Sequence, residues 1–331
     1  MRGSYSVVVS NNLMQFKFTV NRNITILRGD SATGKSRLVE LVREYSLNGN
    51  SSGVTISCDV GCTTLAGIRW QNEIKEIKNS IIFIDEGFDF ISSEEFARAI
   101  RNSDNYYVIA TRESLFNLPY SIMEVYGLKN KTRKSKYQVY DRIYSEFYPL
   151  YDDGIITNKP DAVIVEDSNA GYEFFKAICQ KEGIMCISAK GKTNVYKTVK
   201  DCECGIILVV ADGAAFGSEM ERAISLRKAK NLLFFLPESF EWLILKSGLI
   251  DGSEIQDVLA HPYDFIDSEK YFSWERFFTR LLTDCSKDTY LQYKKDRLNK
   301  HYLNKKEMKA IREAIDSTVD RDNWLHIGDG N

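Results

Sequence analysis

Hydrophobic and polar residues alternate along residues 4–20, and the alternation is interrupted by Asn11-Asn12. An alternation with a period of two is typical of a strand with one buried face, and two such runs around a polar pair predict a β-hairpin. Shorter runs that predict strands follow at 24–27, 54–57, 81–84, 106–110 and 122–126. We expect those at 24–27, 81–84 and 106–110 to be buried, and the run at 81–84 is too apolar to alternate, which is typical of a strand deep in a parallel sheet.

Segments with the spacing of amphipathic helices separate these strands at 35–47, 63–78 and 92–100. Alternating strands and helices predict a parallel α/β sheet, which we expect to end near residue 130. The same alternation starts again after residue 160. It predicts strands at 162–165, 184–187, 205–210 and 232–236, and helices at 170–182, 193–200, 218–228 and 238–247. The remainder of the chain is predicted to be mostly helical.

These patterns predict an α/β protein with two α/β domains and a helical region. The expected divisions are a first domain at 1–130, a linker at 131–160, a second domain at 161–250 and a helical region at 251–331. Turn-forming residues at Asp152-Asp153-Gly154 and Asn158-Lys159-Pro160 support the boundary after the linker. The linker contains a tyrosine-rich part that is alternatively a β-pairing or docking element.

Composition narrows the class of protein. The chain has 331 residues with a net charge of −2, and 44% of them are hydrophobic, which are ordinary values for globular domains. No apolar run is long enough to cross a membrane, and the first residues read as a strand rather than as a secretory leader. The pairs Cys58/Cys62 and Cys202/Cys204 lack the spacing of zinc sites. We expect a cytoplasmic protein with reduced thiols and no membrane partner.

A glycine-rich turn lies between the first predicted buried strand and the first predicted helix. Its residues are Gly29-Asp30-Ser31-Ala32-Thr33-Gly34-Lys35-Ser36, followed by Arg37. The turn matches the spacing G-x-x-x-x-G-K-[ST] in full, in the strand–helix context that such a phosphate-binding loop needs. Backbone amides and the helix N-terminus would bind phosphates, Lys35 would contact the β- and γ-phosphates, and Ser36 would bind Mg²⁺. We therefore expect a nucleoside triphosphate at these residues.

Two later strands end in residues suited to the same chemistry. Asp85 and Glu86 follow the run at 81–84. Asp85 would hold Mg²⁺, and Glu86 would polarise the attacking water. Thr111 and Arg112 follow the run at 106–110. Thr111 would contact the γ-phosphate or the water, whereas Arg112 would act in the site, act at a neighbouring molecule, or only cap the strand.

These segments resemble the Walker A, Walker B and sensor-1 elements of P-loop NTPases. About 50 residues separate Ser36 from Asp85, too few for the helical insertion of an ABC-type ATPase, and no LSGGQ-like signature occurs there. No guanine-reading N-K-x-D motif is visible, so ATP is preferred to GTP. The resemblance is to compact AAA-like ATPases of the ASCE class, and it implies that Lys35, Glu86 and Thr111 are catalytic.

Acidic residues also follow two predicted strands of the second domain. Glu166 follows the run at 162–165, and Asp212 follows Ala211 after the run at 205–210. Both segments resemble the Toprim fold of topoisomerases, primases and OLD-family nucleases, over about residues 160–248. The resemblance implies that both acids bind Mg²⁺ for phosphodiester chemistry. Carboxylate oxygens at adjacent strand ends suit a hard cation, and two such cations would clamp the reacting oxygens.

The sequence departs from that family at one ligand, because Ala214 stands where the second aspartate is expected. Asp167, Glu238 and Glu241 are candidate replacements near the same edge of the sheet. In the alternative interpretation, the strand-end acids are ordinary turn residues of a doubly wound domain, since fold likeness alone does not establish function.

Basic residues and tyrosines interleave near the end of the chain. They are Lys287, Lys294, Lys295, Arg297, Lys300, Lys305, Lys306, Lys309 and Arg312, with Tyr290, Tyr293 and Tyr302. Such a run binds a nucleic-acid backbone, or it forms a solvated face with its tyrosines packed inward. The turn Lys190-Gly191-Lys192 precedes a predicted helix and is interpreted mainly as a helix cap.

The motifs together predict an ATPase fused to a Toprim-like domain, similar to a reduced OLD-family ATPase-nuclease. The resemblance implies a role in microbial antiviral defence, with the nucleotide state gating a domain that acts on DNA or RNA. It also implies a homo-oligomer or a partner protein. Two alternatives stay open: a nucleotide-dependent switch or assembly protein with an inactive second domain, and a small-molecule phosphotransferase, for which the sequence indicates no acceptor pocket.

Overall fold

The computed structural model describes the chain except for residues 30–32, 66, 102, 134–141, 152–158 and 318–331. The chain forms two compact units. The first contains Met1–Tyr151 and His261–Phe272, and the second contains Asp152–Ala260 and Ser273–Asn331. The first unit therefore includes a short stretch that the sequence placed in the helical region. That stretch is attached to the N-terminus, because the Met1 ammonium group lies 3.2 Å from Oδ1 of Asp267.

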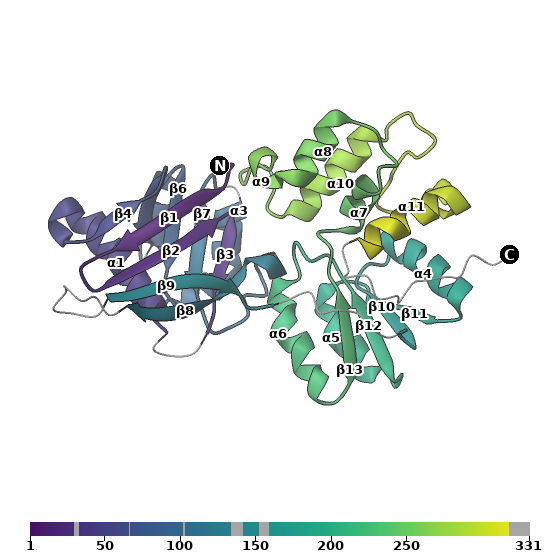
Figure 1. Cartoon of the computed structure of the whole chain (residues 1–331), viewed down its shortest axis with the longest axis horizontal. Helices are drawn as coiled ribbons and strands as arrows, with labels where there is room; N and C mark the ends of the chain where they lie inside the picture. Colours follow the sequence, from purple (N-terminus) through teal and green to yellow (C-terminus); the bar gives the residue numbers. More distant parts are fainter. Residues whose placement is uncertain (30–32, 66, 102, 134–141, 152–158, 318–331) are drawn as a thin grey trace. The chain divides into compact units, whose positions relative to one another are not determined.

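A nine-stranded sheet forms the centre of the first unit (Figure 1). Its strands are β1 (Tyr5–Ser10), β2 (Met14–Val20), β3 (Ile24–Leu27), β4 (Thr55–Ser57), β5 (Gly61–Thr64), β6 (Ser80–Ile84), β7 (Tyr106–Ala110), β8 (Val125–Arg133) and β9 (Arg142–Pro149). Their order across the sheet is β4-β1-β2-β9-β8-β3-β7-β6-β5. The predicted hairpin at 4–20 is confirmed as β1 and β2, which pair antiparallel.

The sheet is mixed, and this corrects the expectation of a parallel sheet. The strands β8, β3, β7, β6 and β5 are adjacent in that order, and each pair among them is parallel, as predicted for buried apolar runs. On the other side, β1 pairs antiparallel with β2 and β4, and β8 pairs antiparallel with β9. Short turns force neighbouring strands to run antiparallel, whereas a parallel pair needs a long crossover. The hairpin pattern thus already implied a mixed sheet.

Two further segments of the first unit differ from the expectation. Residues 63–78 were predicted as one helix, but β5 occupies 61–64 and the helix α2 spans only Trp70–Glu76. The strand β9 lies inside the expected linker at 131–160 and belongs to the sheet, in agreement with the β-pairing alternative. A strand was expected at 122–126, where a 3₁₀ turn, Ile122–Glu124, leads into β8.

Helices cover both faces of the first sheet. The helix α1 (Lys35–Asn48) contacts β1, β4, β5 and β6. On the other face lie α2 and α3 (Glu94–Arg101). Phe83 of β6 packs in the cluster that contains Leu38 of α1, whereas Ile82 packs in the cluster that contains Trp70 of α2 and Phe96 of α3. Because both faces are buried, the central strands have no polar alternation.

The sheet curls strongly around α1. The strands β4 and β5 are the first and last strands of the sheet, yet only residues 58–60 separate them in the chain. A chain spans at most about 3.6 Å per residue, so three connecting residues keep the two ends of the sheet close together. The helix that follows the glycine-rich turn is therefore enclosed by the strands that it contacts.

A four-stranded parallel sheet forms the centre of the second unit, as predicted. Its strands are β10 (Ala162–Val165), β11 (Met185–Ser188), β12 (Ile206–Val210) and β13 (Asn231–Phe235), in the order β11-β10-β12-β13. The connecting helices are α4 (Ala170–Glu182), α5 (Lys192–Asp201) and α6 (Gly217–Ser225). The helix α4 lies on one face and α5 and α6 lie together on the other, as Figure 1 shows. This is the arrangement that right-handed crossovers produce for this strand order.

The rest of the chain adds the helices α7 (Phe240–Lys246), α8 (Ser253–Ala260), α9 (Pro262–Phe265), α10 (Trp274–Cys285) and α11 (Lys305–Asp316). In the second unit, α7 packs against α8, α10 and α11. Between α10 and α11 the chain is mostly irregular, apart from the 3₁₀ turn Lys300–Leu303. Every helix in the described part of the chain is too short or too polar to span a lipid bilayer.

Candidate functional site

Three parallel strands of the first unit end at one edge of the sheet. The strand β7 lies between β3 and β6 and pairs with both of them in parallel. The glycine-rich turn follows β3, Asp85 and Glu86 follow β6, and Thr111 and Arg112 follow β7. Carboxyl ends of parallel strands are the usual place for ligand sites in α/β sheets.

The described part of the glycine-rich turn has a backbone that suits glycine. Gly29 has φ 139° and Gly34 has φ 104°, values that residues with a side chain rarely adopt. Gly34 is the N-cap of α1, and its carbonyl oxygen accepts the Leu38 N–H at 3.0 Å. Asp30, Ser31 and Ala32 lie outside the described residues, so their predicted contacts with phosphate stay predictions.

Lys35 is buried at the start of α1, with 4% of its surface exposed. Its Nζ donates to the carbonyl oxygen of Gly29 at 2.6 Å and to Oγ1 of Thr33 at 3.4 Å. The ammonium group therefore lies over the turn, where a phosphate would bind. A buried ammonium group at the start of the helix is suited to an anionic phosphate.

Ser36 and Asp85 come from different elements and meet at the same edge. Oγ of Ser36 donates to Oδ1 of Asp85 at 3.2 Å, and the same oxygen accepts the Glu86 N–H at 2.9 Å. A hydroxyl oxygen beside a carboxylate oxygen is a donor set that suits Mg²⁺. These residues therefore fit the cation that the sequence predicts.

Glu86 forms an ion pair with Arg112. Nε of Arg112 lies 3.1 Å from Oε2 of Glu86, and Nη2 lies 2.7 Å from Oε1. Both side chains line a surface depression together with Thr33, Gly34, Lys35, Ser36, Arg37 and Glu40. The depression thus brings Glu86 together with residues 33–37 of the predicted phosphate-binding turn. Arg37 also lies there, where it pairs with Glu40 at 3.0 Å.

Thr111 does not direct its hydroxyl group at this depression. The residue is buried, and its Oγ1 donates to the Glu113 carbonyl oxygen at 3.2 Å and accepts the Glu113 N–H at 3.0 Å. The side chain thus stabilises the turn after β7. Its predicted contact with the γ-phosphate or with water stays a prediction.

Asn130 is a contact of the loop that sequence reasoning missed. Its Nδ2 donates to the Thr33 carbonyl oxygen at 3.0 Å, and its Oδ1 accepts from Oγ of Ser145 at 2.7 Å. The two residues lie on β8 and β9, which pair in register at this point. The only signal in the sequence was a polar residue on a strand, which is too common to single out.

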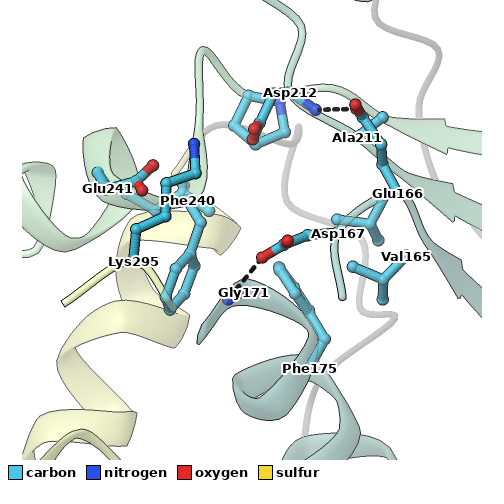
Figure 2. Close-up of a pocket in the computed structure, with 13 residues that line it drawn as sticks. Val165, Glu166, Asp167, Gly171, Phe175, Ala211, Asp212, Phe240, Glu241 and Lys295 are labelled. Atoms are coloured by element: carbon cyan, nitrogen blue, oxygen red, sulfur yellow. Dashed lines mark hydrogen bonds between the residues drawn. The ribbon is translucent and has the colours of Figure 1, made fainter. Parts of the chain in front are cut away.

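The second unit brings Glu166 and Asp212 together. The strands β10 and β12 are neighbours at the centre of the sheet, and their chains continue to opposite sides. Such a switch point leaves a crevice at the carboxyl ends of the two strands. The Asp212 N–H donates to Oε2 of Glu166 at 3.1 Å (Figure 2). The two candidate metal ligands therefore lie side by side at this edge, and their binding of Mg²⁺ stays a prediction.

A small cavity of about 20 Å³ opens at these residues. Its lining includes Asp167, Glu241 and Lys295, and Figure 2 shows the last two on the side opposite Glu166. This volume holds about one water molecule or one cation.

Burial dominates the electrostatics of the crevice. It raises the pKa of the Glu166 carboxyl to about 7. The Asp212 N–H and the charge of Lys192 lower this pKa, whereas the charge of Glu275 raises it further. Burial also raises the pKa of Asp212 well above its usual range, and the charges of Glu275, Glu166 and Glu241 act in the same direction. A carboxyl pair in this state gains a favourable partner when a cation binds.

Positive side chains approach these acids from two elements. Lys192 at the start of α5 donates its Nζ to the Ala215 carbonyl oxygen at 3.2 Å, and burial lowers its pKa. Lys295 pairs with Glu275 of α10. Burial alone would lower the pKa of Lys295, but Glu275, Glu241 and Asp212 together raise it.

Sequence reasoning missed the roles of Glu275 and Lys295, because their distance from Glu166 along the chain hides their proximity. Tyr293 was also missed as a partner of Glu241. Its hydroxyl donates to Oε1 of Glu241 at 2.7 Å, and both side chains are buried. Glu241 is thus held in the core of the second unit.

Two of the three candidate replacement ligands have other structural roles. Oδ1 of Asp167 accepts the N–H groups of Ser168 and Asn169, and its Oδ2 accepts that of Gly171, so the carboxylate stabilises the start of α4. The second is Glu241, which Tyr293 holds. Among the residues that the structure describes, no three acidic, histidine or cysteine side chains gather as a metal site.

The comparisons with known proteins place the chain in no family. No family model matches the sequence, and neither does any curated protein.

Proposed function

We propose that the chain binds ATP with Mg²⁺ at residues 29–37 and hydrolyses it. The observation that carries this proposal is the contact of Ser36 with Asp85 at 3.2 Å, beside the buried ammonium group of Lys35. Three groups from two separate elements thus come together where a triphosphate and its cation would bind. A chance glycine-rich turn would not require the acid at the end of β6 to meet the hydroxyl at the start of α1.

Each residue has one part in the proposed reaction. The backbone amides of the turn and Lys35 bind the phosphates, and Ser36 and Asp85 hold the cation. When bound, Mg²⁺ neutralises charge on the β- and γ-phosphates. Glu86 orients and polarises the attacking water, which requires a free carboxylate oxygen. In the structure Arg112 contacts both oxygens of Glu86, which lowers the basicity of the carboxylate, so we expect the ion pair to open for hydrolysis.

Substitution of Lys35 tests this part of the proposal. Lys35→Ala should abolish measurable affinity for a fluorescent ATP analogue and should abolish hydrolysis in the presence of Mg²⁺. Arg43→Ala is the matched control, because Arg43 is an exposed residue of the same helix. Hydrolysis that survives in Lys35→Ala, in protein shown by circular dichroism to be folded, would remove the proposal.

We further propose that the nucleotide state gates the second unit, a Toprim-like domain that acts on nucleic acid. The supporting observation is the pair Glu166 and Asp212, which shares the crevice at the switch point of a parallel sheet. The donor chemistry fits a divalent cation, because both groups are carboxylates whose pKa burial raises, and a bound cation would stabilise their charged forms. When bound, Mg²⁺ polarises a phosphodiester and activates water.

Cleavage assays test the second part. The native protein, with ATP and either Mg²⁺ or Mn²⁺, should cleave labelled DNA or RNA, single- or double-stranded, and Asp212→Asn should not. Glu254→Gln is the control, since Glu254 is exposed on α8 of the same unit. Absence of cleavage for every substrate and cation would remove the nuclease activity and would leave the ATPase proposal intact.

A second candidate function has its own support. The chain would be a nucleotide-dependent switch whose second unit binds a partner protein or assembles copies without catalysis. Ala214, which is buried where a second ligand is expected, favours this candidate. Titration of Lys35→Ala with Mn²⁺ separates the two candidates, because a catalytic second unit binds the cation without the nucleotide and a switch does not.

A further inference from the structure

The chain between α10 and α11 folds into a defined surface. The Tyr302 hydroxyl donates to the Leu291 carbonyl oxygen at 2.6 Å. Nδ2 of Asn299 donates to the carbonyl oxygens of Tyr290 and Gln292 at 2.9 and 3.1 Å. These bonds join parts of residues 287–309, here called the tail surface, to one another. The Leu298 N–H attaches the tail surface to α4, because it donates to Oε2 of Glu173 at 3.1 Å.

The tail surface carries a concentrated positive charge. It contains eight basic residues, which are Lys287, Lys294, Lys295, Arg297, Lys300, Lys305, Lys306 and Lys309, and three acids, which are Asp288, Asp296 and Glu307. Its formal charge of +5 (8 − 3) contrasts with −2 for the chain, so the rest of the chain carries −7. A positive surface on an otherwise acidic chain is the arrangement that attracts a polyanion.

These basic groups are available for binding. All eight are exposed, and the ion pairs that they form are Lys295 with Glu275 and Lys309 with Glu313. The other six make no ion pair with any residue that the structure describes. One of the three acids is also occupied, because Glu307 is buried and accepts the Tyr290 hydroxyl at 3.0 Å.

One of the three tyrosine rings faces solvent among these basic residues. Tyr293 and Tyr302 are buried, with 1% and 0% of their surface exposed, whereas Tyr290 is 57% exposed. Its ring lies edge-on to His301, with 5.6 Å between the centroids. The contact with His301 positions the ring, and the bond to Glu307 connects its hydroxyl group to α11. An ordered, exposed ring among lysines is a stacking platform for an unpaired base.

We propose that the tail surface binds single-stranded nucleic acid, with its lysines and Arg297 against the phosphates and Tyr290 stacked on a base. This inference refines the nucleic-acid part of the proposed function. A single strand is favoured over a duplex, because stacking on a side chain needs an unstacked base. An acidic membrane surface would suit the lysines but would leave the ordered ring of Tyr290 without a role.

The tail surface also adjoins the crevice of the second unit. Lys295 belongs to both, since it lines the cavity beside Asp212 and Glu241 (Figure 2). A nucleic-acid strand bound on the tail surface would therefore pass the carboxylates of that crevice. This arrangement gives the tail a substrate-binding role in the proposed chemistry.

Fluorescence anisotropy tests the inference with the full chain, in EDTA and without nucleotide, so that no reaction interferes. The probe is a labelled single strand of about 20 nucleotides, DNA or RNA, longer than most single-strand sites. Tyr290→Ala should weaken binding about ten-fold, and Tyr290→Phe, which keeps the ring, should bind within about two-fold of native. A triple variant, Lys300→Ala with Lys305→Ala and Lys306→Ala, should weaken binding and reduce its salt dependence by a slope of about 2.

Controls keep the test decisive. The matched triple variant Lys197→Ala with Lys200→Ala and Lys228→Ala removes exposed lysines from another face of the second unit and should bind as native does. Native binding by both Tyr290→Ala and the Lys300 triple variant would overturn the inference, as would binding of phosphatidylserine vesicles without binding of oligonucleotides. ATP hydrolysis by the same variants should be unchanged. Failure of binding alone therefore leaves the ATPase proposal standing.

Discussion

Arg112 holds both carboxylate oxygens of Glu86, at 3.1 and 2.7 Å, at the edge of the depression beside Lys35. Glu86 would act as the base of the proposed hydrolysis. A carboxylate with both oxygens engaged by a guanidinium group is a poor acceptor for the proton of water. We therefore interpret the ion pair as a resting state that a bound triphosphate opens by competing for Arg112.

We predict that Arg112→Ala raises the basal rate of ATP hydrolysis, by up to about five-fold. The guanidinium group is 55% exposed, and exposed ion pairs are worth at most about 1 kcal/mol, which corresponds to that factor. Steady-state phosphate release measures the effect. Arg98→Ala, which removes another exposed arginine, is the control and should leave the rate unchanged. A rate that falls in Arg112→Ala would show instead that Arg112 contributes directly to catalysis.

We predict that Glu86→Gln binds ATP as native does but hydrolyses it about 100-fold more slowly or worse, since general bases contribute about 10²–10⁴-fold. The amide keeps the shape of the side chain and removes its basicity. Equilibrium binding and single-turnover hydrolysis separate the two effects. Glu40→Gln, which lines the same depression, is the control. Equal hydrolysis by Glu86→Gln and native protein would exclude Glu86 as the base.

We predict that Asn130→Ala raises the KM for ATP about five-fold with little change in kcat. The substitution removes the bond from Nδ2 to the Thr33 carbonyl oxygen, and one hydrogen bond contributes about 1 kcal/mol. Initial rates over a range of ATP concentrations measure both parameters. Asn117→Ala removes a comparable bond to a backbone carbonyl, that of Ser92, and should change neither. An unchanged KM in Asn130→Ala would mean that the loop keeps its shape without this contact.

The second unit should lose stability as the pH rises in the absence of divalent cations. Burial raises the pKa of Glu166 from 4.5 in the unfolded chain to about 7 in the folded unit. The stabilisation from this shift is complete below the unfolded pKa and disappears as the pH rises through the folded one. At about 1.4 kcal/mol per pKa unit, the free energy of unfolding should fall by up to about 3 kcal/mol.

Urea unfolding between about pH 5 and pH 8 in EDTA measures this fall. Glu166→Gln is neutral at every pH and should make the profile less steep, and the raised pKa of Asp212 should leave part of the slope. Glu254→Gln, at an exposed position, should leave the slope unchanged. A profile of Glu166→Gln as steep as that of the native protein would show that Glu166 does not titrate in this range.

We predict that Gly213→Ala destabilises the second unit by about 1–3 kcal/mol, the usual cost of overpacking. A Cβ atom at Gly213 would lie 2.3 Å from the Leu236 carbonyl oxygen and 3.0 Å from that of Pro237, and a backbone cannot yield as a side chain does. Gly87→Ala, where a Cβ atom would meet open space, is the control. Equal urea midpoints for Gly213→Ala and native protein would contradict the close contact.

Much of the architecture follows from local pattern, because strongly apolar runs have few alternatives to a buried strand. The runs at 81–84, 106–110 and 162–165 are strands in the structure. The stretch at 63–78 was misassigned because Thr63 and Thr64, which suit a strand, precede a helix without a clear boundary.

The candidate sites could be predicted only in part. Residues at strand ends, such as Asp85 and Glu166, are visible because the run before them marks the edge of the sheet. Residues that contact the site from elements distant in the chain have no such signal in the sequence around them. Glu275 lies more than 100 residues from Glu166 along the chain and still influences its pKa. The ion pair of Glu86 and Arg112 depends on side-chain geometry that spacing does not encode.

The two ends of the nine-stranded sheet have a consequence for assembly. The end strands β4 and β5 contain only three and four residues. Short end strands present few unpaired backbone groups, so another chain finds little there to extend the sheet. Copies of the first unit would therefore associate through side-chain surfaces, and the oligomeric state should respond to surface substitutions rather than to changes in β4 or β5.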